Sequence, residues 1–370
     1  ITKNDLVFPN EGAFNPYRTL YEETNSMRKN RVFGNMSLNI NLPVDGLTLT
    51  LRGGVDMSDE FRTQKKPYYS VGYKQGMYRE QSVRRTEINM DFLARYVNNK
   101  LVGKHLGFNV AFGGNTMNYN YYNQKITLKK LNIEGVYNVN NAPQSDIPIP
   151  YQTRQRKAVN SLYGFANLSW DDTYFLDITG RNDWSSTLAR GNWSFFYPSV
   201  SGSVLFDRLL NLDLKTTWID MLKLRLSWAN VGNDTTPYSL DNAYVTTDYT
   251  GGFRISDVLM NRLIKPENVE SWEAGIETRF FHNRIGFDAA VYASSTTNQI
   301  VSATTDIMAG ASSMKINSGE IRNLGIQLSL HVQPIQTRDF DWTIDMNWSR
   351  NWNKLVSMSD DWDNSQPLTT

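Results

Sequence analysis

Cysteine is absent from this 370-residue chain, and histidine occurs only three times. Without cysteine the chain has no disulfide bond, no thiol nucleophile and no thiolate ligand for a metal ion. Its charge is nearly balanced, with 38 Lys and Arg against 37 Asp and Glu. No long-range field therefore favours nucleic acid as a partner. No run approaches the roughly 20 apolar residues of a transmembrane helix, which excludes a helical membrane protein.

Sequence patterns of known catalytic sites are missing as well. His105, His282 and His331 do not stand in H-E-x-x-H spacing, and the chain has neither a G-x-S-x-G elbow nor a P-loop. The acidic run at 360–364 offers oxygen ligands for Ca²⁺ but lacks the glycine and the terminal Glu of an EF-hand loop, so we interpret it as a solvated loop. We predict that the chain is not an enzyme and holds neither a cofactor nor a metal ion.

What the chain does have is a regular alternation of apolar and polar residues, clearest at 161–206. Small and apolar residues occupy every second position from Leu162 to Trp170 and again from Tyr174 to Gly180, on either side of a turn at 171–173. A third alternating segment begins at Pro198, where a strand's first residue tolerates the missing N–H. This pattern predicts an antiparallel hairpin followed by a third strand.

The same period recurs along the whole chain and predicts an all-β protein of about twelve strands. The predicted strands cover residues 32–42, 47–57, 88–96, 106–112, 162–170, 174–180, 198–206, 222–228, 272–280, 285–293, 324–332 and 342–348. Most have the roughly 9 to 11 residues that a tilted strand needs to cross a bilayer, whereas ordinary strands average about 5 to 6.

The lengths of the connections alternate between short and long. Long connections are predicted after every second strand, at 58–85, 115–160, 231–270 and 294–321. Outer-membrane β-barrels have this asymmetry, with short periplasmic turns and long extracellular loops, whereas compact soluble domains seldom have several long loops. The pattern therefore favours a transmembrane antiparallel β-barrel.

Charged side chains are confined to the polar positions of the predicted strands. They are Arg52, Asp56, Glu87, Asp91, Arg95, Glu273, Glu277, Arg279, Asp288 and Asp345. A lipid-facing surface requires such segregation. A soluble sandwich shows the same alternation with its apolar row buried, so this alternative stays open. Aromatic residues beside short turns, namely Trp170, Tyr174, Phe280 and Trp342, fit the interfacial girdle of a barrel.

Two segments near the predicted hairpin resemble a known family. Gly180–Leu188 (GRNDWSSTL) and Ser194–Ser201 (SFFYPSVS) are similar to the SusC/RagA family of TonB-dependent outer-membrane transporters. Further similar segments are Asn15–Tyr17, Lys223–Asp234, Lys265–Gly275 and Ser318–Ile326.

This resemblance implies a barrel of about 22 strands with a plugged lumen, in the outer membrane of a Gram-negative bacterium. It also implies import of oligosaccharides or peptides with energy from TonB, a SusD-like surface lipoprotein over the barrel mouth, and contact with outer-membrane lipid. The chain starts at Ile1, and we recognise no plug, TonB-contacting segment or closing strand. We therefore expect residues 1–370 to be part of the barrel domain, with long extracellular loops, and TonB to act through the missing plug region.

Two other functions remain open at this point. One is an outer-membrane barrel without transport activity, such as an adhesin, a receptor or a membrane enzyme. The other is a soluble β-rich binding protein.

Three groups of residues are candidates for functional contacts. Tyr119, Tyr121 and Tyr122, in a predicted long loop, offer aromatic faces to a ligand, or they pack within the loop or against the lid. Trp184 and Trp193 either contact a ligand or order the short loop between them. The plug-facing candidates of the lumen are Asp177, Arg181, Asp183 and Arg225.

Overall fold

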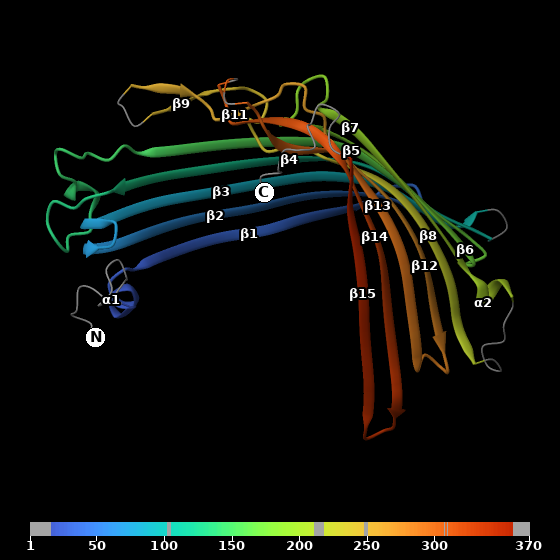
Figure 1. Cartoon of the computed structure of the whole chain (residues 1–370). Coiled ribbons are helices and arrows are strands. Elements are labelled where there is room, and N and C mark those ends of the chain that lie inside the picture. The colour runs from blue at the N-terminus through green and yellow to red at the C-terminus, as the bar shows by residue number, and fades with distance from the viewer. Residues whose placement is uncertain are drawn as a thin grey trace. The chain divides into compact units, whose positions relative to one another are not determined.

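The computed structural model describes residues 16–101, 105–210, 218–247, 251–306, 308 and 310–357. Twelve long strands dominate it, and most connections are short (Figure 1). The long strands are β1 (Asn25–Asn41), β2 (Leu47–Ser70), β3 (Tyr73–Leu101), β4 (Leu106–Leu128), β5 (Tyr151–Trp170), β6 (Tyr174–Ser185), β7 (Ser194–Leu205), β8 (Ile219–Asn233), β12 (Glu267–Phe280), β13 (Ile285–Thr304), β14 (Ser313–Gln336) and β15 (Asp341–Ser357).

The remaining elements are short. They are α1 (Pro16–Tyr21), η1 (Val139–Asn141), α2 (Phe206–Leu209), β9 (Tyr244–Thr246), β10 (Phe253–Ile255) and β11 (Val258–Leu259). None of the helices in the described ranges has the length and apolar composition needed to cross a membrane.

Strands that follow one another in sequence are also neighbours in the sheet. The order runs from β1 to β8, then β12, β13 and β14, with β15 on β14, and β11 adds a short parallel pairing to β14. Tight turns enforce antiparallel pairing, because a parallel return needs a crossover of a dozen or more residues. The predicted all-β, antiparallel arrangement of twelve main strands is thus confirmed.

The prediction of a long loop at 58–85 is wrong, because β2 continues to Ser70 and β3 starts at Tyr73. Gly72, with a φ of 79°, supplies the left-handed backbone of the turn between them. The strands at 115–160 also extend farther than predicted, and leave 129–150 as their connection. The predicted long loop at 294–321 is wrong as well, because β13 continues to Thr304 and β14 starts at Ser313. In these parts of the strands neither face requires apolar side chains, so the alternation of apolar and polar residues ends. The hydrogen bonds between the strands and the cross-strand pairs of Thr, Tyr and Arg nevertheless continue.

The chain divides into two compact units. Unit 1 comprises Ile1–Ser37, Arg52–Met90 and Met117–Ala158, and unit 2 comprises Leu38–Leu51, Asp91–Thr116 and Val159–Thr370. Unit 1 has an apolar cluster in which Tyr78, Leu128 and Leu131 are buried, and Ile126, Tyr137 and Val139 pack against them. This cluster anchors the 129–150 connection.

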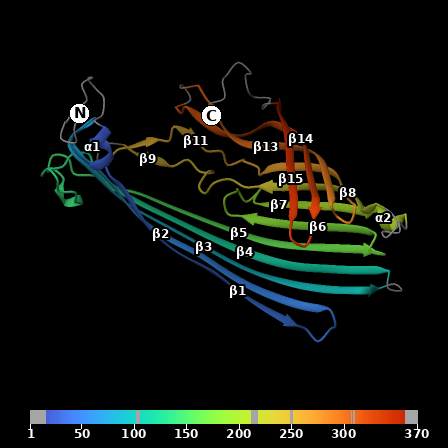
Figure 2. The same cartoon turned by 90° about the horizontal axis from the view of Figure 1, so that it is seen from below.

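The strand ends of unit 2 differ in their connections. Tight turns at 171–173 and 281–284 lie near the end that carries α2, whereas β9 and β11 lie near the opposite ends of the strands (Figures 1 and 2). β12 to β15 run side by side, and each pairs antiparallel with the next (Figure 1).

The apolar row predicted from alternation is exposed on the sheet of unit 2. Its members include Leu176, Ile178, Leu224, Leu226, Ile276, Val291 and Leu324. Leu226 is 55% exposed and Leu324 is 49% exposed, although a soluble sandwich would bury these side chains against a second sheet. The exposed row fits contact with lipid and argues against the soluble alternative.

Candidate functional site

The polar row of unit 2 forms chains of hydrogen bonds that run across the strands. Arg95 Nε donates to Asn109 Oδ1 (2.8 Å), and Asn109 Nδ2 donates to Asn167 Oδ1 (2.6 Å). Asn167 Nδ2 then donates to Asp177 Oδ1 (2.6 Å), whose other oxygen accepts from Ser201 Oγ (3.3 Å). One network therefore joins five consecutive strands, from β3 to β7.

A second network surrounds the predicted residues Arg181 and Asp183. Arg181 Nε donates to Asp183 Oδ1 (2.7 Å), and its NH2 group donates to Ser161 Oγ (2.7 Å). The hydroxyl of Tyr197 donates to the other oxygen of Asp183, which is buried. The Arg181 guanidinium also lies over the ring of Tyr163, 5.7 Å from its centroid. Asp183 is thereby satisfied from within the sheet.

Three glycines allow long side chains of the polar row to cross a neighbouring strand. Tyr163 on β5 crosses Gly113 on β4, and its hydroxyl donates to Asp91 Oδ2 on β3 (3.3 Å). A Cβ at Gly113 would lie 2.7 Å from Tyr163 Cζ, so only glycine leaves the ring enough room.

Arg225 on β8 crosses Gly275 on β12 in the same way. Its guanidinium donates two hydrogen bonds to Asp288 on β13, at 2.6 and 3.0 Å, and a Cβ at Gly275 would lie 2.6 Å from Arg225 Nε. Tyr292 crosses Gly325 to reach Asn351 Oδ1 (3.2 Å). We call these three arrangements glycine-spanning braces. The alternation of apolar and polar residues does not reveal these braces, although a glycine at a polar position of a strand is a usable signal.

All four predicted plug-facing residues lie on the polar row. Asp177, Arg181 and Asp183 belong to the two networks, and Arg225 belongs to a brace. Much of their hydrogen-bonding capacity is used inside the sheet, so contact with a plug stays a prediction.

The predicted pair Trp184 and Trp193 flanks a well-anchored loop. Ser185 and Thr187 are buried, and both hydroxyls donate to Asp234 Oδ2 from the connection after β8. Trp193 is exposed, whereas Trp184 lies half-buried at the end of β6. The second interpretation, an ordered short loop, explains the motif around these residues, and ligand contact stays a prediction.

The three candidate tyrosines lie within β4 rather than in a loop, and they divide between its two faces. Tyr119 and Tyr121 share one face, because alternate residues of a strand point the same way, and Arg85 lies over the Tyr121 ring at 5.6 Å. Tyr122 points to the other face, where its hydroxyl accepts from Gln152 Nε2 (2.8 Å) and its ring lies under Arg154. The three residues are therefore not one cluster.

A buried carboxylate, Glu60 on β2, collects three cations on the polar face of unit 1. Arg85 NH1 and Lys29 Nζ lie 2.8 and 3.1 Å from Glu60 Oε1, and Arg62 NH2 donates to Oε2. Burial raises the pKa of Glu60, but the hydrogen bonds from Lys29 and Arg62 and the charges of Arg62 and Arg85 outweigh it and lower this pKa to about 2. Glu60 is therefore ionised throughout the physiological range.

Acidification is expected to loosen the strands around Glu60. Because its pKa falls from 4.5 to about 2 on folding, ionised Glu60 stabilises the fold above about pH 4.5, and this contribution is lost as the pH falls toward 2. At pH 7, Glu60→Gln should lower the local free energy of unfolding by about 2 kcal/mol. This loss corresponds to roughly 30-fold faster amide hydrogen exchange in β1 and β2. Exchange measured by mass spectrometry in full-length protein tests this, with exposed Glu134→Gln as control. Wild-type exchange rates in Glu60→Gln would contradict the prediction.

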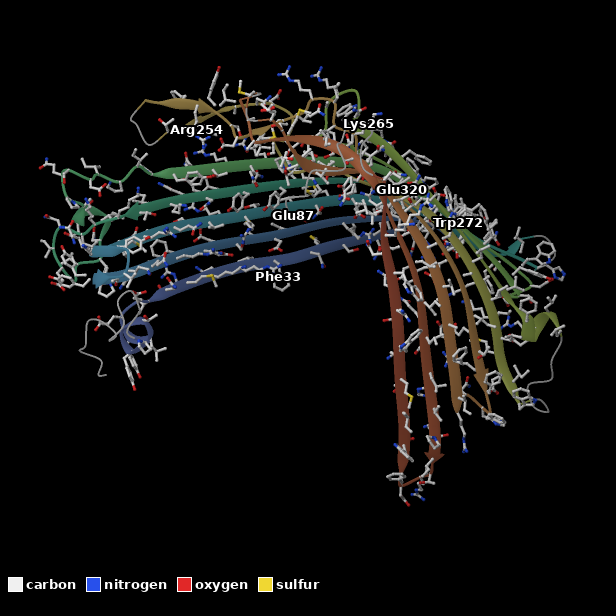
Figure 3. The ribbon with its side chains drawn as sticks, viewed as in Figure 1. Phe33, Glu87, Arg254, Lys265, Trp272 and Glu320 are labelled. Atoms are coloured by element: carbon white, nitrogen blue, oxygen red, sulfur yellow. The ribbon has the colours of Figure 1, made fainter. Side chains whose placement is uncertain are left out.

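Two tryptophans pair on the apolar row, of which Trp272 is exposed and Trp228 is half-buried. Glu270 Oε1 accepts from Nε1 of both Trp228 (3.0 Å) and Trp272 (3.2 Å), and Trp272 is 51% exposed on β12 (Figure 3). Amphipathic rings with a polar partner suit a membrane interface. No group of three or more acidic or histidine side chains in the described ranges is placed to hold a metal ion.

Comparison with known proteins agrees with this geometry. Residues 2–370 match the family described as TonB dependent receptor-like, β-barrel. TonB-dependent receptor P3 of Formosa agariphila is 29% identical over 212 residues, which cover 54% of this chain and 20% of the relative. TonB-dependent receptor SusC of Bacteroides thetaiotaomicron is 26% identical over 216 residues, which cover 55% of this chain and 21% of SusC.

Among solved structures, the RagAB peptide transporter has a similar fold. The TM-score is 0.86 at 21% identity, and the match covers 95% of this chain and 40% of that chain. The chain thus spans well under half the length of the relatives it matches, and the resemblance to SusC and RagA is confirmed. The chain belongs to the TonB dependent receptor-like, β-barrel family, and it forms part of an outer-membrane protein of a Gram-negative bacterium.

Proposed function

We propose that the protein containing this chain imports oligosaccharides or peptides across the outer membrane, with energy relayed by TonB. The family match over 2–370 is the observation that carries this proposal. The exposed apolar row on one face of the sheet and the bonded polar row on the other suit a wall between lipid and a polar lumen. In this proposal the 171–173 turn faces the periplasm, and residues 1–370 belong to the barrel domain with extracellular loops.

The proposed partners are a SusD-like surface lipoprotein over the barrel mouth and TonB acting through a plug. The named relative SusC and the solved RagAB peptide transporter support this choice of partners. Within this proposal, Asp177, Arg181, Asp183 and Arg225 face the plug. Tyr119, Tyr121, Tyr122, Trp184 and Trp193 are the proposed ligand contacts.

Deletion of the gene for the full-length protein is expected to abolish growth on at least one oligosaccharide or peptide mixture whose presence induces the gene. Growth should return on complementation, and deletion of TonB should reproduce the defect, because active import needs the energy that TonB relays. Growth curves on single nutrient sources provide the measurement. Unchanged growth of the deletion strain on every inducing nutrient would exclude import as the function and favour an adhesin or a receptor.

A further inference from the structure

Positive charge is concentrated in unit 1. Its ranges contain 19 Lys and Arg against 11 Asp and Glu, whereas the ranges of unit 2 contain 19 against 26. The near neutrality of the whole chain therefore conceals a basic unit and an acidic unit. A folded unit with such an excess attracts anions to its surface.

The excess is only partly neutralised on the polar face of β1 to β3, where Arg31 pairs with Asp56. Lys29, Arg62 and Arg85 share the single carboxylate of Glu60. Arg79 donates its Nε to the uncharged hydroxyl of Thr127 (3.0 Å), and no carboxylate lies within ion-pair distance of it among the described residues. Around Glu60 and Arg79, four cations thus accompany one anion, while Arg31 and Asp56 on the same face pair with each other.

An open pocket of about 510 Å³ lies between these strands, entirely within unit 1. Its lining residues are Arg62, Arg79, Asn25, Gln64, Gln81, Met27, Ser26 and Thr63. No Asp or Glu belongs to this lining. The pocket therefore brings two cations together, of which Arg62 is engaged by the Glu60 carboxylate beside the pocket and Arg79 has no carboxylate partner among the described residues.

The protein leaves part of this donor capacity unused. Arg62 Nε is enclosed and has no hydrogen-bond partner among the described residues. The Arg62 side chain as a whole is 41% exposed, so other N–H groups of its guanidinium remain accessible to an acceptor from outside the chain. The planar guanidinium fork matches the two oxygens of a carboxylate.

Two of the candidate tyrosines share the face of this pocket. Gln81 Nε2 in the lining donates to Asn123 Oδ1 (2.9 Å), and Tyr119 and Tyr121 occupy the same face of β4 as Asn123. Tyr119 and Tyr121 therefore lie on the same face as the pocket, outside its lining.

We propose that the pocket lined by Arg62 and Arg79 is a subsite for a carboxylate group of the ligand, so that the protein takes up acidic oligosaccharides or acidic peptides. This inference rests on the proposed import function and narrows its substrate class. Acidic oligosaccharides and acidic peptides share the carboxylate group, and the choice of probes distinguishes these two ligand classes.

Isothermal titration calorimetry of the full-length protein in detergent at 150 mM salt tests the inference. The acidic probes are tri-galacturonate and hexaglutamate, and their neutral counterparts are methyl-esterified tri-galacturonate and hexaglutamine. Arg79→Gln removes a pocket charge without touching the Glu60 network. Arg28→Gln removes the same charge from an exposed residue on the opposite face of β1 and is the matched control. A heat-dependent shift in gel mobility verifies that each variant is folded.

The wild type is expected to bind at least one acidic probe at least tenfold more tightly than its neutral counterpart. Arg79→Gln should weaken that binding at least tenfold, while Arg28→Gln changes it less than twofold. Equal affinity for acidic and neutral probes, or an Arg79→Gln effect below threefold or equal to that of Arg28→Gln, would overturn the inference. Growth of the deletion strain distinguishes the proposed import function from the proposed carboxylate subsite. If the strain loses growth only on a neutral nutrient, the import function stands and the carboxylate subsite is contradicted.

Discussion

Leu226→Arg is expected to remove at least nine-tenths of the assembled protein from the outer membrane. Leu226 is 55% exposed on the apolar row of β8, opposite Gly202 on β7 and Ala274 on β12. Neither small neighbour can shield a guanidinium from lipid. An arginine facing the middle of a bilayer costs roughly 2 to 4 kcal/mol, which lowers the equilibrium constant for assembly in the membrane by about 30-fold or more. Quantifying the heat-modifiable form in outer-membrane fractions measures the effect.

Ser227→Arg is the matched control for this experiment. Ser227 is the next residue of β8, so its side chain points to the polar face, where it lies opposite Glu273. A new arginine there gains an acidic neighbour and remains outside the lipid. Assembly close to wild type is expected. Equal losses in both variants would show that the two faces of β8 do not separate lipid from lumen.

Gly113→Ala is expected to lower the stability of the assembled protein by about 3 kcal/mol. A Cβ at this position would lie 2.5 Å from the backbone oxygen of Phe92 and 2.7 Å from the ring of Tyr163. A backbone atom cannot move aside by a change of rotamer, so β3 and β4 must separate locally, and the hydrogen bond of Tyr163 to Asp91 is lost. Overpacking of this kind typically costs about 1 to 3 kcal/mol, and loss of the hydrogen bond adds to it.

Gly54→Ala tests whether the brace, rather than glycine itself, causes this loss. Gly54 also occupies a polar position of a strand, but the nearest atom to its Cβ would be the backbone oxygen of Gly34 at 3.8 Å, an ordinary contact. Alanine there should be neutral or slightly stabilising, because it restricts the unfolded chain. The urea concentration at which the heat-modifiable form disappears compares the two variants. Equal midpoints for Gly113→Ala and the wild type would show that no brace exists at Gly113.

The strands of the membrane wall could be predicted from sequence because lipid on one face and polar contacts on the other impose a period of two. The predicted segment 222–228 lies inside β8, and 174–180 lies inside β6. Prediction failed for β2 and β3 beyond residue 58, where both faces tolerate polar side chains. A period of two appears in the sequence only where the two faces of a strand have different surroundings. Where both faces contact water, the pattern no longer distinguishes a strand from a loop.

The candidate site shows the same limit. The sequence placed Arg181 and Arg225 on the polar row, but their partners Ser161 and Asp288 lie 20 and 63 residues away. The pocket near Glu60 was missed, because its lining comes from three strands and each segment alone resembles a solvated, charged stretch.

The sequence by itself determined the all-β class, the two faces of each membrane strand and, through its motifs, the family. These properties follow from local alternation and from contiguous residues. Only the tertiary structure decided which side chains share a network, which glycines allow a side chain to cross a strand, and where positive charge remains without a partner. Such contacts depend on the register between strands, and register is set by the pairing of distant segments.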